Sequence, residues 1–287
     1  TSVNDAPTGS AGSLASVSED VSSPSGAAVS GLFSLTDTND NQTALGGSSA
    51  GTLTAIAITG NAATAGQGTW QYSTDSGANW TAVATSGLSD SSAVVLNTSA
   101  LLRFVPAADW NGTPGSLTVR VSDGTGLSTA SYGTAKNLGT IDATSGWSNA
   151  TVSLGTSITA VNDAPTRGAS DNLATATLTA IGEDTANPAG GTVSSLFGAN
   201  FYDGKDAVSG GSSANTLAGV AIVDYARDAS KGEWQYKTVS GSWTTIGASV
   251  ALDSAILLKD TDSLRFVPAA NFNGSAPVLG VRLIESG

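Results

Sequence analysis

The chain of 287 residues contains two copies of one sequence pattern. The motif Val-Asn-Asp-Ala-Pro-Thr at residues 3–8 returns at residues 161–166. Later in each copy, Leu-Arg-Phe-Val-Pro-Ala-Ala at residues 102–108 returns without change at residues 264–270. The period is the size of a domain, so the repeat predicts an array of separate domains and not a solenoid of small units.

We place the boundary of the two predicted domains after residue 160, which gives domains at residues 1–160 and 161–287. Short segments that alternate polar and apolar residues dominate both copies, as at residues 52–58 and 117–121. No segment sustains a helical period, and Gly, Asn and Ser turns separate the short runs. The pattern predicts an all-β fold made of two tandem antiparallel β-sandwich domains of cadherin or immunoglobulin type.

The second copy is shorter than the first at its carboxyl end. In the first copy, the strand-like residues 117–121 are followed by residues 122–160 before the next Val-Asn-Asp motif. The second copy ends just past the equivalent strand at residues 279–283. A sandwich without its closing strands exposes an edge and part of its core. We therefore expect that the chain continues past Gly287 or that a strand from elsewhere completes the second domain.

Composition restricts the chemistry of the chain. It has no His, Cys or Met, and 23 Asp and Glu against 11 Lys and Arg give a net charge of -12. Without His and Cys, a Ser-His-Asp triad, a Cys nucleophile and the usual zinc, haem and iron–sulfur sites are excluded. The negative charge disfavours nucleic-acid binding, and no apolar run is long enough for membrane insertion. No carboxylate pair is singled out for glycoside hydrolysis, so we predict a protein that is not an enzyme.

Once sites that need His or Cys are excluded, oxygen ligands for a hard cation remain. These ligands occur in the same order along both copies. Each copy has the Asn-Asp of its first motif, then a Glu-Asp pair, then an acidic loop. Asp and Asn also favour turns, which is the purely structural reading of the loops. Because exposed carboxylates repel one another unless a cation binds them, we predict Ca²⁺ at the domain junctions. The candidate metal ligands are Glu19, Asp20, Asp37, Asn39, Asp40, Asn162, Asp163, Glu183, Asp184, Asp203 and Asp206.

Three further features, a lysine, the repeated Trp residues and two strand arginines, can each be interpreted as structural or as functional. Lys205 lies inside the second acidic loop, which argues against a tight cation site there. Repeated Trp residues on hairpin strands are predicted to lie in the core and not on a sugar-stacking platform. Arg103 and Arg265 stand between apolar strand residues, so we expect each to pair with a carboxylate.

Taken together, these motifs resemble the cadherin-like tandem repeats of giant bacterial RTX-type adhesins. The resemblance rests on the Val-Asn-Asp-Ala-Pro-Thr junctions, the Glu-Asp pairs, Gly-x-Trp-Gln-Tyr and Leu-Arg-Phe-Val-Pro-Ala-Ala, and it covers nearly the whole chain. It implies Ca²⁺-stabilised extender domains, type I secretion and an extracellular place on the bacterial cell surface. By motif, the family's calcium role would fall on Glu19, Asp20, Asn162, Asp163, Glu183 and Asp184. The RTX nonapeptide Gly-Gly-x-Gly-x-Asp does not occur in residues 1–287.

The expected function is that of a Ca²⁺-rigidified spacer that projects a ligand-binding tip. Its expected partners are neighbouring repeats of the same chain, with a glycan or peptide ligand bound by an adjacent domain. One alternative is a module that itself binds a sugar or peptide, or a split domain beside such a module. Another alternative is a filament or sheath subunit whose last domain is completed by a neighbour's strand.

Overall fold

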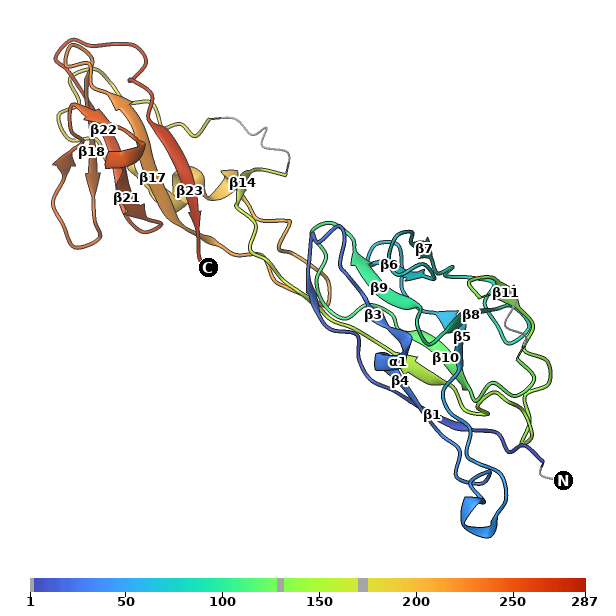
Figure 1. Ribbon diagram of the computed structural model, residues 1–287. Helices are drawn as coiled ribbons and strands as arrows, with labels where there is room; N and C mark the ends of the chain where they lie inside the picture. The colour runs from blue at the N-terminus through green and yellow to red at the C-terminus, as the bar shows by residue number, and fades with distance from the viewer. Residues whose placement is uncertain (1–2, 128–131, 170–174) are drawn as a thin grey trace. The chain divides into compact units, whose positions relative to one another are not determined.

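The structure is a computed structural model that describes residues 3–127, 132–169 and 175–287. Strands make up 36% of it and helices 7%, which confirms the predicted all-β class. The chain divides into two compact units (Figure 1). Unit 1 comprises Thr1–Val161 and Val208–Ser212, and unit 2 comprises Asn162–Ala207 and Ser213–Gly287. None of the helices in the described ranges is long and apolar enough to cross a membrane.

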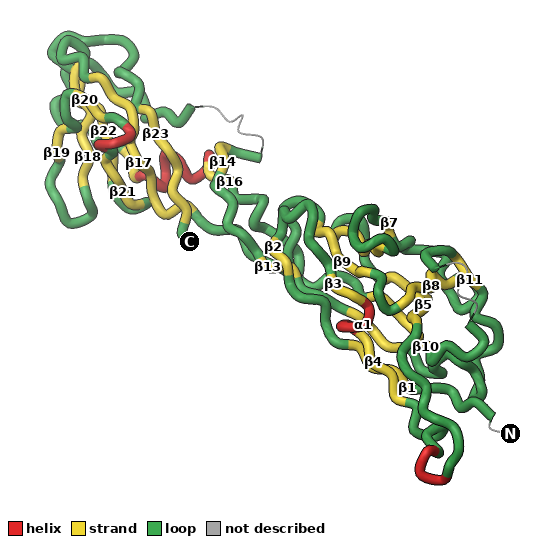
Figure 2. The backbone as a smooth tube through the Cα atoms, viewed as in Figure 1, coloured by secondary structure: helices red, strands yellow, loops and turns green. Residues whose placement is uncertain are grey.

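Unit 1 is built on two main sheets (Figure 2). In sheet order, the five-stranded sheet contains β11 (Ala135–Lys136), β8 (Ala93–Asn97), β5 (Ala55–Asn61), β10 (Leu117–Ser122) and β12 (Val152–Leu154). The four-stranded sheet contains β3 (Ala27–Ala28), β9 (Leu101–Pro106), β6 (Gly68–Ser73) and β7 (Thr81–Ala82). Smaller elements are β1 (Thr8–Ala11) paired with β4 (Phe33–Thr36), β2 (Val17–Ser18) paired in parallel with β13 (Ile158–Thr159), α1 (Val29–Leu32) and η1 (Thr43–Leu45).

In the part of the chain that the structure describes, unit 2 repeats this plan with fewer strands. Its long strand β17 (Leu217–Ala226) pairs with β20 (Ser249–Val250), β21 (Ile256–Lys259) and β23 (Gly280–Glu285). The opposing sheet contains, in order, β15 (Gly191–Thr192), β22 (Ser263–Pro268), β18 (Gly232–Lys237) and β19 (Thr244–Thr245). Smaller elements are β14 (Thr166–Arg167) paired with β16 (Phe201–Tyr202), α2 (Val193–Phe197), η3 (Gly198–Asn200) and η4 (Leu252–Ser254).

The repeated Trp motif forms the same core contact in each unit. Trp70 lies opposite Phe104 in the β6–β9 pairing, and the two rings meet edge to face with centroids 5.3 Å apart. Trp234 and Phe266 have the same register in unit 2, with centroids 5.6 Å apart. Such pairs stabilise beyond the apolar area they bury. Trp70 is fully buried and Trp234 partly buried, so the core placement predicted for them is confirmed.

The second Trp of each hairpin stacks on an arginine instead of entering the core. The Arg103 guanidinium carbon lies 3.9 Å from the centroid of the Trp80 ring, within the range of a cation–π contact. Its Nε donates to Gln71 Oε1 at 2.8 Å and its Nη1 to the Pro24 carbonyl at 3.1 Å. Arg265 has the same type of partners in unit 2, Trp243, Gln235 and Pro188 among them. The prediction that each arginine pairs with a carboxylate is therefore wrong, because neutral oxygens and an aromatic ring face contact each guanidinium instead.

The β6–β7 turn holds a carboxylate with a lowered pKa, which predicts a pH effect. Asp75 accepts from the Asn79 backbone amide at 2.8 Å, the Asn79 side chain at 2.6 Å and Ser73 Oγ at 2.7 Å. These bonds favour the charged form and lower the pKa of Asp75 from 3.8 to about 2. We expect an NMR titration of the folded chain to give a midpoint near pH 2, and Asn79→Ala to raise it.

The sign of the linked stability change follows from the depressed pKa. The stabilisation that ionised Asp75 contributes to the free energy of unfolding is fully present above its unfolded-state pKa. It is lost as the pH falls through the folded-state pKa. The stability difference between the native chain and Asp75→Asn should therefore shrink between about pH 4 and pH 2. A folded-state midpoint equal to the one measured in urea would contradict the hydrogen-bond arrangement.

Candidate metal centre

Three carboxylates converge in unit 2. One oxygen from each of Asp203, Asp206 and Glu285 lies within 4.8 Å of the others. Asp203 and Asp206 stand in the loop after β16, and Glu285 is the last residue of β23, paired with Leu217. Asp203 is 5% exposed and Asp206 4% exposed. Long-range strand pairing thus brings a buried loop and a strand end to one place.

The Asn-Asp pair of the repeated motif lies in the same cluster. The backbone amide of Asp163 donates to the two Asp206 oxygens at 3.1 and 3.4 Å. Asn162 donates its side-chain amide to Glu285 Oε1, and its Oδ1 accepts from Asn215 Nδ2 at 3.0 Å. These bonds fix the first residues of unit 2 against the acidic loop.

Two buried oxygens of this cluster have no hydrogen-bond partner in the described part of the chain. They are Asp203 Oδ1 and Glu285 Oε2. A buried carboxylate oxygen without a partner loses its hydration and gains nothing in return. Two ionised carboxylates 4.8 Å apart also repel by roughly 3 to 4 kcal/mol at an effective dielectric constant of 20. A bound cation would remove both penalties, so this cluster could hold a metal ion.

Lys205 does not prevent the cluster from forming. Its ammonium group extends to Asp163 Oδ1 at 3.3 Å, and its side chain is 52% exposed. A pair this exposed contributes little to stability because solvent screens it. Asp203, Asp206 and Glu285 converge in the presence of Lys205, so its effect on cation binding at this loop stays a prediction.

Unit 1 brings together the corresponding segments. Asp37 and Asp40 are buried in the matching loop, and Asp40 Oδ2 accepts from the Asp5 backbone amide at 3.0 Å. Asn4 donates its side-chain amide to Asp123 Oδ2 at 3.4 Å. Asp123 follows β10, as Glu285 ends β23. The sequence repeat therefore brings the corresponding segments together in both units, but among the described residues only Asp203, Asp206 and Glu285 of unit 2 have carboxylate oxygens within 4.8 Å of one another at this position.

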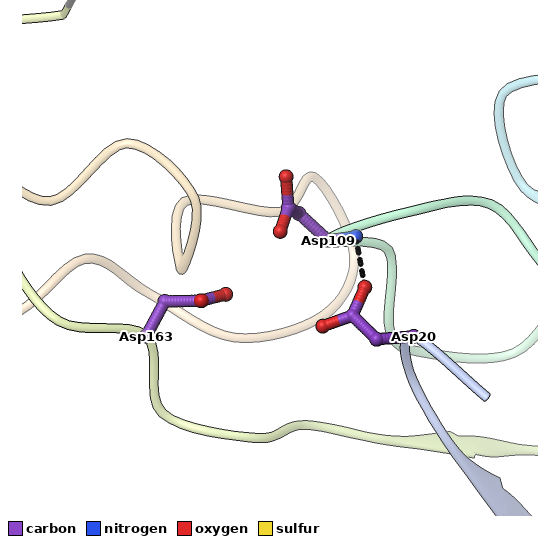
Figure 3. A group of neighbouring side chains, drawn as sticks. All are labelled: Asp20, Asp109 and Asp163. Atoms are coloured by element: carbon purple, nitrogen blue, oxygen red, sulfur yellow. Dashed lines mark hydrogen bonds between the residues drawn. The ribbon is translucent and has the colours of Figure 1, made fainter.

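The Glu-Asp pairs lie in a second group of polar residues. In unit 1, Glu19 is buried, and its carboxylate accepts from the Val161 backbone amide at 2.6 Å and from Asn111 Nδ2 at 3.1 Å. Asp20 accepts from the Asp109 backbone amide at 2.9 Å (Figure 3). Glu19 follows β2, which with β13 lies at the end of unit 1 away from the N terminus (Figure 2).

Unit 2 repeats the bonds of this second group at its surface. Glu183 accepts from Asn273 Nδ2 at 3.2 Å, and Asp184 accepts from the Asn271 backbone amide at 2.8 Å. Both acidic residues are exposed, whereas Glu19 is buried. The repeated motif therefore fixes the bonds in both units, but burial differs between them.

The structure sorts the predicted ligands into these two groups, with one exception. Asn39 is exposed between Asp37 and Asp40, and its backbone carbonyl accepts from Gln42. Sequence reasoning missed Asp123 and Glu285. An acidic residue at the end of the same Arg-containing strand in both copies was the signal that could have found them.

Comparison of the chain with protein-family models, with curated proteins and with solved structures finds no match. The candidate centre combines buried carboxylates, oxygens without a partner in the described ranges, and amide donors that hold the loop in place. Such a centre could hold a cation, with oxygen atoms as its ligands.

Proposed function

We propose that this chain is a non-catalytic, Ca²⁺-rigidified spacer segment of an extracellular protein, like the bacterial RTX-type adhesins it resembles. The observation that carries the proposal is the cluster of Asp203, Asp206 and Glu285 with its unpartnered buried oxygens. A structural site of this kind contributes stability and rigidity, and it requires neither a nucleophile nor a general base.

The choice of Ca²⁺ follows from the donors. Carboxylate and amide oxygens suit hard cations, whereas transition metals favour the imidazole and thiolate groups that this chain lacks. Ca²⁺ accepts six to eight oxygens in flexible geometry, and Mg²⁺ demands a near-ideal octahedron and keeps several waters. The cluster offers oxygens from three carboxylates, and Ca²⁺ tolerates an irregular arrangement of such oxygens better than Mg²⁺ does.

Chain connectivity supports a role for the cation at the junction between the units. The Val161 amide is held by Glu19. Asn162 and Asp163 follow directly, and two extended residues span at most about 7 Å. Acidic groups of two units are thereby attached to one short stretch of chain, which Pro165 stiffens further. We propose that Ca²⁺ bound by this stretch limits its bending and so converts a string of units into a rod.

Calcium removal tests this function. We expect Ca²⁺ added to the chelator-treated chain to raise the melting temperature by roughly 5 to 10 °C, as mass action on a millimolar site implies. Small-angle scattering of the same samples should give a longer maximum dimension with Ca²⁺ than with chelator. Mg²⁺ at equal ionic strength is the control.

Two results would overturn the spacer proposal. Equal melting temperature and equal maximum dimension with Ca²⁺ and with chelator would exclude the calcium role. Saturable binding of a glycan or peptide from an array to this segment alone would favour a ligand-binding module instead.

A further inference from the structure

The turn Val208–Ser212 belongs to unit 1, although it lies in the second copy of the sequence pattern. The residues on either side of it belong to unit 2. The described chain therefore passes between the units at residues 161–162, 207–208 and 212–213. Two units joined by a single linker ordinarily move relative to each other, and further passes of the chain restrain that motion. We call Val208–Ser212 the strap.

The side chain of Asn111 holds the strap in unit 1. Asn111 is 2% exposed, and its Oδ1 accepts from the Ser212 backbone amide at 2.6 Å. Its Nδ2 donates to Ser212 Oγ at 2.8 Å and to Glu19 Oε2 at 3.1 Å. The bond to Glu19 orients the amide group of Asn111, so both polar atoms of this side chain are positioned to bind one residue of the strap.

Two glycines allow the strap and its binding site to approach closely. A Cβ at Gly211 would overlap Asn111 Oδ1, and a Cβ at Gly112 would lie 2.9 Å from the Gly210 carbonyl oxygen. Glycine is the residue that permits such an approach of one backbone to another group. The Asn-Gly site and the Gly-Gly-Ser sequence of the strap are therefore complementary in shape as well as in hydrogen bonds.

Backbone bonds within the strap give it its own structure. Its first residue donates its amide to the carbonyl of its last residue at 3.1 Å, and the Gly211 amide donates to the Val208 carbonyl at 3.0 Å. The corresponding turn of the first copy, at residues 42–48, is closed between its first and last residues in the same way, at 2.9 Å. Because local bonds form the turn, little conformational entropy is lost when unit 1 binds it.

We propose that the Asn-Gly site of unit 1 is a binding site for the Gly-Gly-Ser turn of the next sequence copy, and that the strap joins the two copies without a cation. Each copy contains both halves of this contact. Asn-Gly occurs at residues 111–112 and 273–274. Gly-Gly-Ser occurs at residues 46–48 and 210–212. The strap goes beyond the proposed calcium role, because an amide, a hydroxyl and a backbone N–H form it and no metal is needed.

Amide exchange in the full chain, treated with chelator, tests the strap. The Ser212 amide donates to Asn111, so we expect it to exchange slowly in the native chain and at least tenfold faster in Asn111→Ala. Asn273→Ala makes the same change in the corresponding motif of unit 2 and should leave Ser212 exchange unchanged. Unchanged exchange in β6 and β9 shows that unit 1 of the Asn111→Ala variant is folded.

A pair of introduced cysteines tests the same contact by a gain of signal, and it decides the matter if Asn111→Ala unfolds unit 1. The chain has no Cys, so Asn111→Cys combined with Ser212→Cys provides its only thiols. Their side chains meet in the native fold, so we expect them to form a disulfide with glutathione disulfide at least tenfold faster than the control pair. The control pair is Asn273→Cys combined with Ser212→Cys.

Two results would overturn the strap. One is Ser212 exchange that is equally fast in the native chain and in folded Asn111→Ala, and the other is an equal rate of disulfide formation in both cysteine pairs. Both experiments are done in chelator, so their failure leaves the calcium effects on melting temperature and maximum dimension unaltered. Conversely, absence of those calcium effects would leave the protection of the Ser212 amide unaltered.

Discussion

Asp203→Asn is expected to abolish most of the stabilisation that Ca²⁺ confers on unit 2, a loss of roughly 5 to 10 °C in melting temperature. The substitution keeps the shape of the side chain and removes one of three converging charges. Without Ca²⁺ the variant should melt at the same temperature as the native chain or higher, because the repulsion of Asp203 with Asp206 and with Glu285 is gone. The expected signature is thus a reversal of the stability order between the two conditions.

Calorimetry with Ca²⁺ and with chelator measures this reversal, and amide exchange in β17 assigns it to unit 2. Asp253→Asn is the matched control, since it makes the same charge change at an exposed residue of η4. Glu285→Gln should behave like Asp203→Asn. If both substitutions destabilise unit 2 equally with Ca²⁺ and with chelator, the cluster is not a metal centre.

Trp70→Ala is expected to lower the free energy of unfolding of unit 1 by about 3 to 5 kcal/mol, the usual cost of removing a large aromatic residue from a core. Trp70 is fully buried, contacts Phe104 edge to face and donates its indole N–H to the Gly115 carbonyl at 2.8 Å. The truncation leaves a cavity and an unpartnered carbonyl. A loss of this size is a large share of the stability of a typical domain.

Trp234→Ala is the matched comparison, because it stands in the same motif and its N–H donates to the Pro277 carbonyl at 2.7 Å. Trp234 is only partly buried, so the expected loss in unit 2 is smaller. Urea denaturation followed by amide exchange in β6 and β18 separates the two units. Equal losses in both units would contradict the difference in burial.

The all-β class was predictable because it depends on local pattern. Period-two alternation and frequent turn residues favour strands and leave no room for long helices. The Gly of Gly-x-Trp-Gln-Tyr is an example of a single residue whose type reports the local strand geometry. Gly68 and Gly232 both have φ of 135°, and a Cβ there would lie 2.3 Å and 2.2 Å from the carbonyl oxygens of Val105 and Val267. Only glycine fits at these two positions, so a motif that repeats the glycine also repeats the strand pairing around it.

The candidate metal ligands were predictable in part. Asp37, Asp40, Asp203 and Asp206 were identified from their loops, and the structure buries all four. Asp123 and Glu285 were not identified, because each is joined to its loop only by strand pairing across a long stretch of chain. The partners of Arg103 were not predictable either, since a strand pattern shows that the guanidinium is flanked by apolar residues but not which oxygens surround it.

Sequence alone determined the repeat, the strand periodicity and the residue types available to a cation, because these are properties of neighbouring residues. Tertiary structure decided which carboxylates meet and which of their oxygens lack a hydrogen-bond partner in the described ranges. Those features depend on contacts between residues far apart in sequence. Burial is decided by such contacts, so nearly identical motifs leave Glu19 buried and Glu183 exposed.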